Sequence, residues 1–175
     1  GGLERNLPVK GEPDTQWCIP LTLSDTKDVF WDEPRGVFAD YGKMWLDGPA
    51  GDMAWKHAMG RSESKDFINW SKPELVLTPD DVDPPHTEFH TAPVFLYAGC
   101  YFSLAQVLNR AELGGVIDIE LMLSRDGFRW ERPFRDTFFI DRKDAKSFET
   151  GSMFTNSTPV ILEDEIRFYY GAYSF

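Results

Sequence analysis

A ten-residue pattern occurs twice in this chain, at residues 64–73 and again at residues 124–133, sixty positions later. Both copies fit S-[KR]-D-x-x-x-W-x-[KR]-P, with six positions matched and no gap. A second, apolar pattern relates residues 93–102 to residues 159–168, and residues 29–38 form a looser third copy. A unit that recurs every 60 to 66 residues restricts the chain to repeat architectures, in which one supersecondary unit stacks on the next.

Each unit consists of short apolar segments bounded by turns. Strands are predicted at residues 92–97, 101–107, 117–124 and 165–170, and the best short helical stretch is residues 106–113. Aromatic residues make up 15% of the chain, which also favours β-structure. Four antiparallel strands per unit are typical of a propeller blade, so the sequence predicts an all-β chain built from β-propeller blades.

Counting the units gives about two and a half blades. The predicted division is an N-terminal segment, residues 1–24, followed by blade units at about residues 25–82, 83–145 and 146–175. A closed propeller needs about four to eight blades. The strand at residues 165–170 lacks the outer hairpin of the earlier units, and an unpaired strand edge can pair with another chain. We therefore expect self-association through exposed blade edges.

The Ser-x-Asp part of the ten-residue pattern has a structural explanation. The carboxylates of Asp66 and Asp126 can accept hydrogen bonds from backbone N–H groups of a hairpin turn, and Gly127 permits a positive φ there. We expect Trp70 and Trp130 to be buried between adjacent blades. The pattern resembles the sialidase Asp-box, with one residue fewer before the tryptophan.

The charge balance excludes several classes of partner. With 18 Lys and Arg against 29 Asp and Glu, the net charge is −11, which opposes binding to nucleic acid and to anionic membranes. The sequence has no apolar run of the roughly 20 residues that a membrane span needs. Cys18 and Cys100 are expected to be buried free thiols, since Cys100 lies in an apolar strand pattern. No zinc-type spacing occurs, so a structural zinc site is not expected. No cofactor is predicted, and the sequence assigns the chain to no compartment.

Three stretches, at residues 28–33, 60–67 and 118–127, resemble the five-bladed β-propeller glycoside hydrolases, a superfamily that includes arabinanases, β-xylosidases, invertases and levansucrases. The resemblance begins at about Ser24 and covers about half of the expected five blades. It implies a deep axial pocket with three carboxylates from the innermost strands of different blades. Glycoside cleavage needs a proton donor and a second carboxylate on the opposite face of the sugar. The invertase-type Trp-Met-Asn-Asp-Pro motif and an Arg-Asp-Pro motif are absent from this sequence.

The candidate site residues precede or begin the inner hairpin of each unit. The predicted catalytic carboxylates are Asp28, Glu88 and Glu149; the predicted substrate-binding residues are Asp25, His86, His90 and Asn156. His86, Glu88 and His90 alternate and would share one face of a strand. A structural salt bridge for Glu88, turn caps for Asp28 and Glu149, and surface positions for the histidines are the alternatives. A metal site at the histidines is not assigned.

Other polar and aromatic residues are expected to have structural roles. Asp32 and Glu33 are predicted to be solvated turn residues, and the acidic run at residues 80–85 is predicted to be a solvated loop. Trp17 and Trp31 are predicted to pack in the core rather than stack on a sugar. The functional hypothesis is a carbohydrate-active propeller of the glycoside hydrolase type, whose partner is a carbohydrate. The alternative is a non-catalytic carbohydrate-binding or interaction module.

Overall fold

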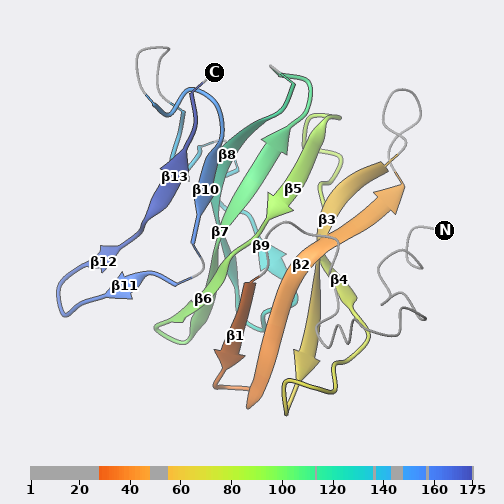
Figure 1. Ribbon diagram of the computed structural model, residues 1–175, viewed down its shortest axis with the longest axis vertical. Helices are drawn as coiled ribbons and strands as arrows, with labels where there is room; N and C mark the ends of the chain where they lie inside the picture. Colours follow the sequence, from red (N-terminus) through yellow and green to blue (C-terminus); the bar gives the residue numbers. More distant parts are fainter. Residues whose placement is uncertain are drawn as a thin grey trace, which may run out of the picture.

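The computed structural model describes residues 28–47, 55–112, 114–135, 137–142, 148–156 and 158–174. All regular secondary structure in these segments is β-structure (Figure 1). None of the described residues forms a helix of the length and hydropathy needed to cross a membrane. The prediction of an all-β chain is therefore confirmed.

The first blade is a four-stranded antiparallel meander. Its strands are β1 (Asp28–Asp32), β2 (Val37–Asp47), β3 (Trp55–Ser64) and β4 (Glu74–Leu77), and they lie in the sheet in this order. A tight turn joins β1 to β2, in which the amide N–H groups of Arg35 and Gly36 donate to the carbonyl oxygen of Asp32. Gly36 has a φ of 63°, a conformation that glycine adopts without strain.

The second blade repeats this meander with its inner strand in two pieces. Its strands are β5 (Thr87–Thr91), β6 (Val94–Tyr97), β7 (Cys100–Asn109), β8 (Val116–Ser124) and β9 (Trp130–Glu131). Both β5 and β6 pair with β7, and the ladder is shifted near Phe89. Pro93 stands between the two pieces and has no N–H group to donate to a ladder. The stretch at residues 106–113 begins in β7 and is not helical in its described part.

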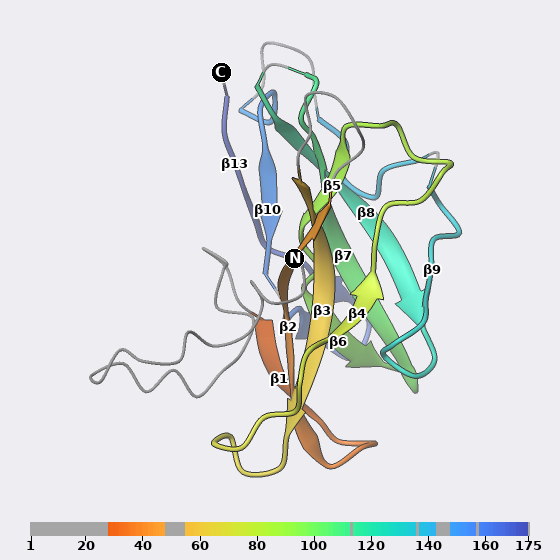
Figure 2. The same cartoon turned by 90° about the vertical axis from the view of Figure 1, so that its right-hand side faces the viewer.

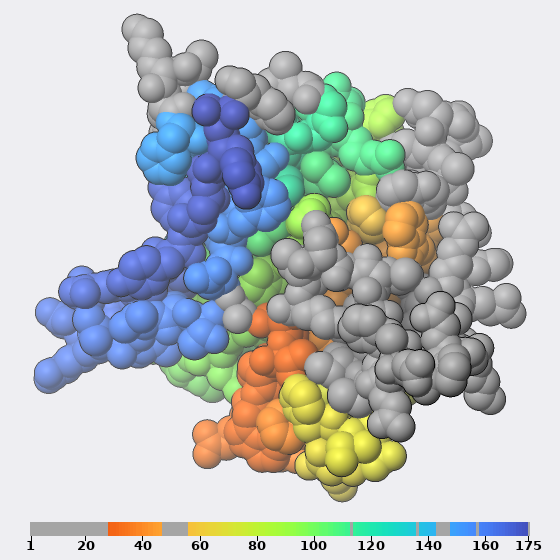
Figure 3. Space-filling model, viewed as in Figure 1, coloured from red at the N-terminus to blue at the C-terminus, as the bar shows by residue number. Residues whose placement is uncertain are grey.

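The third unit consists of two short ladders. Its strands are β10 (Met153–Thr155), β11 (Val160–Ile161), β12 (Ile166–Arg167) and β13 (Tyr170–Ala172). β10 pairs with β13, and β11 pairs with β12, both antiparallel. The predicted strand at residues 165–170 is thus divided between β12 and the start of β13. The β11–β12 hairpin projects from the body of the molecule (Figures 1 and 3).

The units stack side by side, with the second blade between the other two (Figures 1 and 2). The core between the first and second blades includes the fully buried side chains of Met59, Phe89 and Met122. Between the second blade and the third unit, Leu104 and Met153 are buried in the same way. Each such side chain contributes roughly 1.5–3 kcal/mol by leaving water, so the stacking of the blades supplies much of the stability.

The two Ser-x-Asp turns have the same hydrogen bonds. Oδ1 of Asp66 accepts from the backbone N–H groups two and three residues later at 2.9 and 2.7 Å, and Oδ1 of Asp126 does so at 2.8 and 2.8 Å. The residue after each aspartate has a positive φ, 64° at Phe67 and 76° at Gly127. The prediction of two equivalent hairpin turns is confirmed. In the first turn the residue with positive φ is Phe67, although glycine adopts this conformation more readily.

The two tryptophans of the repeat differ in their surroundings. Trp130 is half-buried and packs edge-on against Tyr41 of the first blade, with ring centroids 6.0 Å apart. Trp70 is also half-buried, but it packs on Phe67 of its own turn, and its indole N–H donates to the Phe67 carbonyl oxygen at 3.2 Å. The predicted position between blades therefore applies to Trp130, whereas these contacts of Trp70 stay within the first blade.

Candidate functional site

Glu88, near the start of β5, is the most completely buried of the three predicted catalytic carboxylates. Its Oε2 accepts the backbone N–H of His57 at 2.7 Å and lies 2.9 Å from Nδ1 of the same histidine. Its Oε1 accepts from Arg110 Nη1 at 3.0 Å. Burial opposes ionisation of Glu88, but the bonds from His57 and Arg110 outweigh it, so the pKa of Glu88 is lowered. Glu88 is therefore an ionised carboxylate at neutral pH.

His90 lies two residues further along β5 in a chain of hydrogen bonds. Its Nε2 is 3.2 Å from Nζ of the buried Lys43, and its Nδ1 is 3.2 Å from Oε1 of Gln106. An ammonium group can only donate, so Nε2 of His90 accepts and the ring proton is on Nδ1, from which it donates to Gln106. The Gln106 amide donates to the carbonyl oxygen of Thr155 at 3.4 Å. This chain of bonds joins strands of all three units.

Asp28 and Glu149 are each bonded to a different part of the structure. Asp28 is buried at the start of β1, and its Oδ2 accepts the Val94 backbone N–H of β6 at 2.6 Å. Glu149 precedes β10 and accepts a hydrogen bond from the Tyr170 hydroxyl. Both carboxylates bind within or between inner hairpins, and their grouping with Glu88 in one catalytic set stays a prediction.

The register of β2 shows where Asp28 and Glu88 lie relative to each other. Asp28 pairs with Tyr41, whereas His57, which binds Glu88, pairs with Trp45. Four residues of strand separate these two levels, which is about 13 Å. Glu88 consequently lies nearer to the level of His57 and Trp45, whose rings are in edge-on contact at 4.8 Å.

The remaining predicted residues have more open positions. His86 is half-buried in the turn before β5, where its carbonyl oxygen accepts the Arg110 backbone N–H at 3.1 Å. Asn156 is exposed directly after β10. Asp25 lies outside the described residues, as do Trp17 and Cys18. In the described segments, no group of three His, Cys, Asp or Glu side chains is placed to hold a metal ion.

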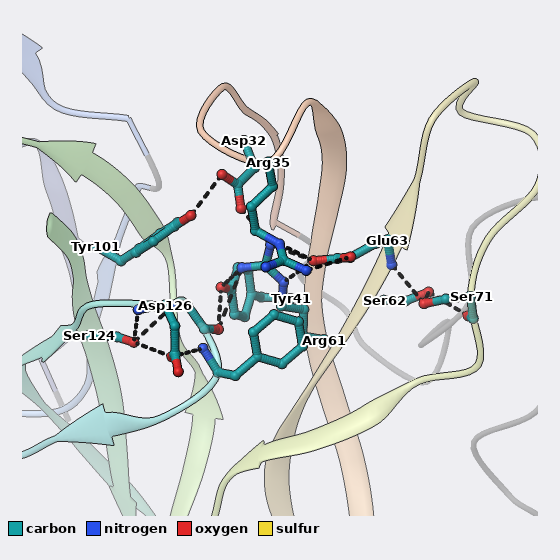
Figure 4. Close-up of polar contacts among 12 residues, drawn as sticks. Asp32, Arg35, Tyr41, Arg61, Ser62, Glu63, Ser71, Tyr101, Ser124 and Asp126 are labelled. Carbon is teal, nitrogen blue, oxygen red and sulfur yellow. Dashed lines mark hydrogen bonds and ion pairs between the residues drawn. The ribbon is translucent and has the colours of Figure 1, made fainter. Parts of the chain in front are cut away.

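The prediction that Asp32 is a solvated turn residue is wrong, because Asp32 is completely buried. Its Oδ2 accepts from Arg61 Nη2 at 2.5 Å, and its Oδ1 accepts from the Tyr101 hydroxyl at 2.8 Å (Figure 4). The Arg61 guanidinium also contacts the Tyr41 hydroxyl and Glu63. The turn residue is covered because side chains of both blades converge on it. We call these five residues the Arg61 cluster.

One other expectation is also wrong. Trp31 is 49% exposed on β1 and makes an edge-on contact with Phe38, so it is not a core residue. The acidic run is exposed, as expected, except at Asp83, whose side chain is buried and binds Arg132 at 2.6 Å. Glu33 is exposed, as expected, and Cys100 is a half-buried free thiol.

Lys43, His57, Gln106 and Arg110 are site residues that sequence reasoning missed. Lys43 offered a signal, because it stands in β2 beside the buried Met44 and next but one to the buried Tyr41. A charged residue within such a strand needs a partner. The other three gave no such signal, because their roles depend on which strands meet.

Comparisons with known proteins show the fold at low sequence identity. No protein-family model matches the chain, and no curated protein matches it. An N-acetylgalactosamine deacetylase from F. plautii, solved with blood group B trisaccharide, superposes with a TM-score of 0.64 and 16% identity over 83% of this chain and 40% of that one. A structure described as a glycoside hydrolase gives a TM-score of 0.65 and 14% identity over 97% of this chain and 47% of that one.

This chain spans less than half the length of these two proteins. At such identities the likeness establishes the fold alone. The chain has the all-β fold of the β-propeller glycoside hydrolases, as the repeats and the resemblance predicted. Five as the number of blades in the complete ring stays a prediction.

Proposed function

We propose that this chain forms the sugar-binding inner strands of a carbohydrate-active propeller of the glycoside hydrolase type. The observation that carries the proposal is Glu88, a fully buried and ionised carboxylate at the start of an inner strand, surrounded by the nitrogen donors of His57 and Arg110. Both superposed proteins support it, since one is named a glycoside hydrolase and the other was solved with a trisaccharide.

The protonation state of Glu88 defines its chemical role. A lowered pKa disfavours a proton donor and favours a general base, a nucleophile or a group that orients sugar hydroxyls. The proton donor of the proposed reaction is then Asp28 or Glu149. His86, His90 and Asn156, with Asp25, are proposed to bind sugar hydroxyls. His90 accepts a bond from Lys43, so in this arrangement it acts as a neutral ring rather than as an acid.

A non-catalytic carbohydrate-binding module is the second candidate. It is favoured by the bonds that the three carboxylates already make: Glu88 with Arg110, Asp28 with a backbone amide and Glu149 with a tyrosine hydroxyl. Carboxylates held in this way can be structural, as salt bridges often are. The two candidates differ in one property, which is whether a glycosidic bond is broken.

The test compares binding and hydrolysis in the same chain. The wild type, Glu88→Gln and the control Glu131→Gln, which changes an exposed residue of β9, are assayed with a panel of 4-nitrophenyl glycosides. A hydrolase loses about 100-fold or more of its activity in Glu88→Gln and none in the control. Binding without hydrolysis supports the second candidate. If no glycoside is bound or cleaved by the wild type, both candidates are refuted.

We further propose that the chain self-associates through its third unit. The side chains of Ile161 and Tyr173 are 48% and 66% exposed there, and Val160, Leu162 and Tyr169 are exposed as well. Exposed apolar groups that are contiguous usually mark a contact surface. Light scattering on the purified chain decides this: a mass of 20.1 kDa at tens of micromolar, the mass of the single chain, would refute the proposal.

A further inference from the structure

A cavity of about 330 Å³ lies on the second blade, beside the loop that enters it from the first blade. It is lined by the loop that connects the blades, by β5, β7 and β8, and by the segment after β9. Thr87 lines it, while Glu88 follows Thr87 directly in β5 and so points to the opposite face of that strand. Its volume is within the range of about 300–1,000 Å³ that small-molecule sites occupy.

Ion pairs line this cavity: those of Arg132 are buried, and that of Arg142 with Glu112 is partly exposed. Arg132 donates to both oxygens of Glu120 at 2.9 and 2.8 Å and to Asp83 at 2.6 Å. Arg142 donates to Glu112 at 2.8 Å. Buried ion pairs are seldom more stabilising than apolar packing of similar volume. The stability of the fold alone therefore does not explain why the ion pairs of Arg132 lie beside open space.

Asp118 has bonding capacity that faces this space. It is 3% exposed, and its Oδ1 accepts from Arg142 Nε at 2.8 Å. Its Oδ2 accepts no hydrogen bond from any residue that the structure describes, although Asp118 lines the cavity. A ligand hydroxyl in the cavity would supply a donor to this oxygen.

Apolar side chains also line the cavity, namely Val82, Val107 and Phe138. Val107 pairs with Asp118 across β7 and β8, so apolar and charged groups lie side by side in the lining. A lining of apolar groups beside fixed donors and acceptors matches a sugar ring, which has an apolar face and a rim of hydroxyl groups. The four carboxylates and three guanidinium groups of the lining leave a small negative excess, which disfavours anions.

We propose that this cavity is a second carbohydrate site, which binds one neutral sugar ring with Asp118 and Arg132 at its hydroxyls and Phe138 at its apolar face. The site is separate from the inner-strand site around Glu88 and does not depend on whether that site is catalytic. It assigns a ligand-binding role to this face of the second blade, where the ion pairs would otherwise have only a structural one.

The experiment titrates the ¹⁵N-labelled full chain with the methyl glycosides of glucose, galactose, mannose and xylose, up to about 50 mM, well above the millimolar Kd of a weak site. One glycoside should shift the amide signals of Thr87, Asn109 and Phe138. Val82→Trp should abolish these shifts, because Val82 is 74% exposed and lines the cavity, so a larger side chain there obstructs it without disturbing the core. Ile68→Trp, at a 69% exposed position outside the cavity lining, is the matched control.

A second variant tests the proposed contact directly. Asp118→Asn should weaken binding of the same glycoside about tenfold or more, because it removes an ionised acceptor. Glu88→Gln should leave the cavity shifts unchanged, because Glu88 points to the opposite face of β5 from the cavity residue Thr87. The inference is overturned if no glycoside shifts the cavity amides, if the shifts survive Val82→Trp, or if they appear only around His57 and His90.

Discussion

The substitution Gly127→Ala tests how the Ser-x-Asp turn of the second blade is fitted against the first blade. Gly127 has a φ of +76°, and a Cβ atom built there would lie 2.2 Å from Arg61 Nη1 and 2.9 Å from the Tyr41 hydroxyl oxygen. The Gly127 carbonyl oxygen also accepts a hydrogen bond from that hydroxyl at 2.7 Å. Alanine would therefore strain the backbone and displace the buried Arg61 guanidinium.

The expected loss of stability has two parts. A non-glycine residue in the left-handed conformation costs about 1–2 kcal/mol. Displacing Arg61 weakens its bonds to Asp32, and a buried charge deprived of its partner costs about 3–5 kcal/mol when the separation is complete. Because the guanidinium can shift without leaving the cluster, we expect Gly127→Ala to lower the free energy of unfolding by about 3–5 kcal/mol in total.

The matched control is Gly99→Ala. Gly99 has nearly the same φ, +75°, but a Cβ atom added there would meet nothing within 4 Å, so only the backbone strain applies. Urea titrations followed by tryptophan fluorescence would give both free energies of unfolding. The difference between the variants should be at least about 2 kcal/mol. Equal losses would show that the contact of Gly127 with the Arg61 cluster has no energetic weight.

Three further predictions concern charge. Backbone N–H groups of Arg129 and Phe128 hold the pKa of Asp126 below its ordinary value, so its stabilising effect is present above about pH 4 and is lost as the pH falls; Asp126→Asn should flatten the acid decline in urea titrations. Burial raises the pKa of Tyr101 to about 12, so its contribution to the stability of the fold is complete below about pH 10 and is lost as the pH rises above it. In an absorbance titration, Tyr101→Phe should remove one phenol that ionises late. An unchanged number of late-ionising phenols in the variant would contradict this. Arg61→Met should lower the free energy of unfolding by about 3–5 kcal/mol, and adding Asp32→Asn should recover part of that loss; a double variant no more stable than the single one would count against the ion pair.

Local features of the fold could be predicted because they depend on neighbouring residues. The Ser-x-Asp turns are stabilised by bonds between Asp66 or Asp126 and amides two and three residues later, so the pattern alone defines them. The strand at residues 117–124 is apolar and turn-bounded, and it is found within β8. The third unit was less predictable, since its strands are too short for a clear alternation pattern.

The candidate site was only partly predictable for a different reason. The sequence placed Glu88 and His90 on an inner strand, because polar residues precede an apolar run. It could not show that His57 of β3 binds Glu88, or that Lys43 of β2 binds His90, since these pairs lie 31 and 47 residues apart. Such pairs form only when two blades stack.

The sequence by itself determined the repeat, the β-strands, the blade turns and the sign of the molecular charge, because periodicity and turn chemistry act over a few residues. Tertiary structure decided the environment of each charged side chain. Asp32 has the sequence context of a solvated turn residue, yet it is buried by Arg61 and by Tyr101 of the next blade. Burial is a property of the surfaces that meet, and the ionisation and bonding of a carboxylate depend on burial and on partners far away in the sequence.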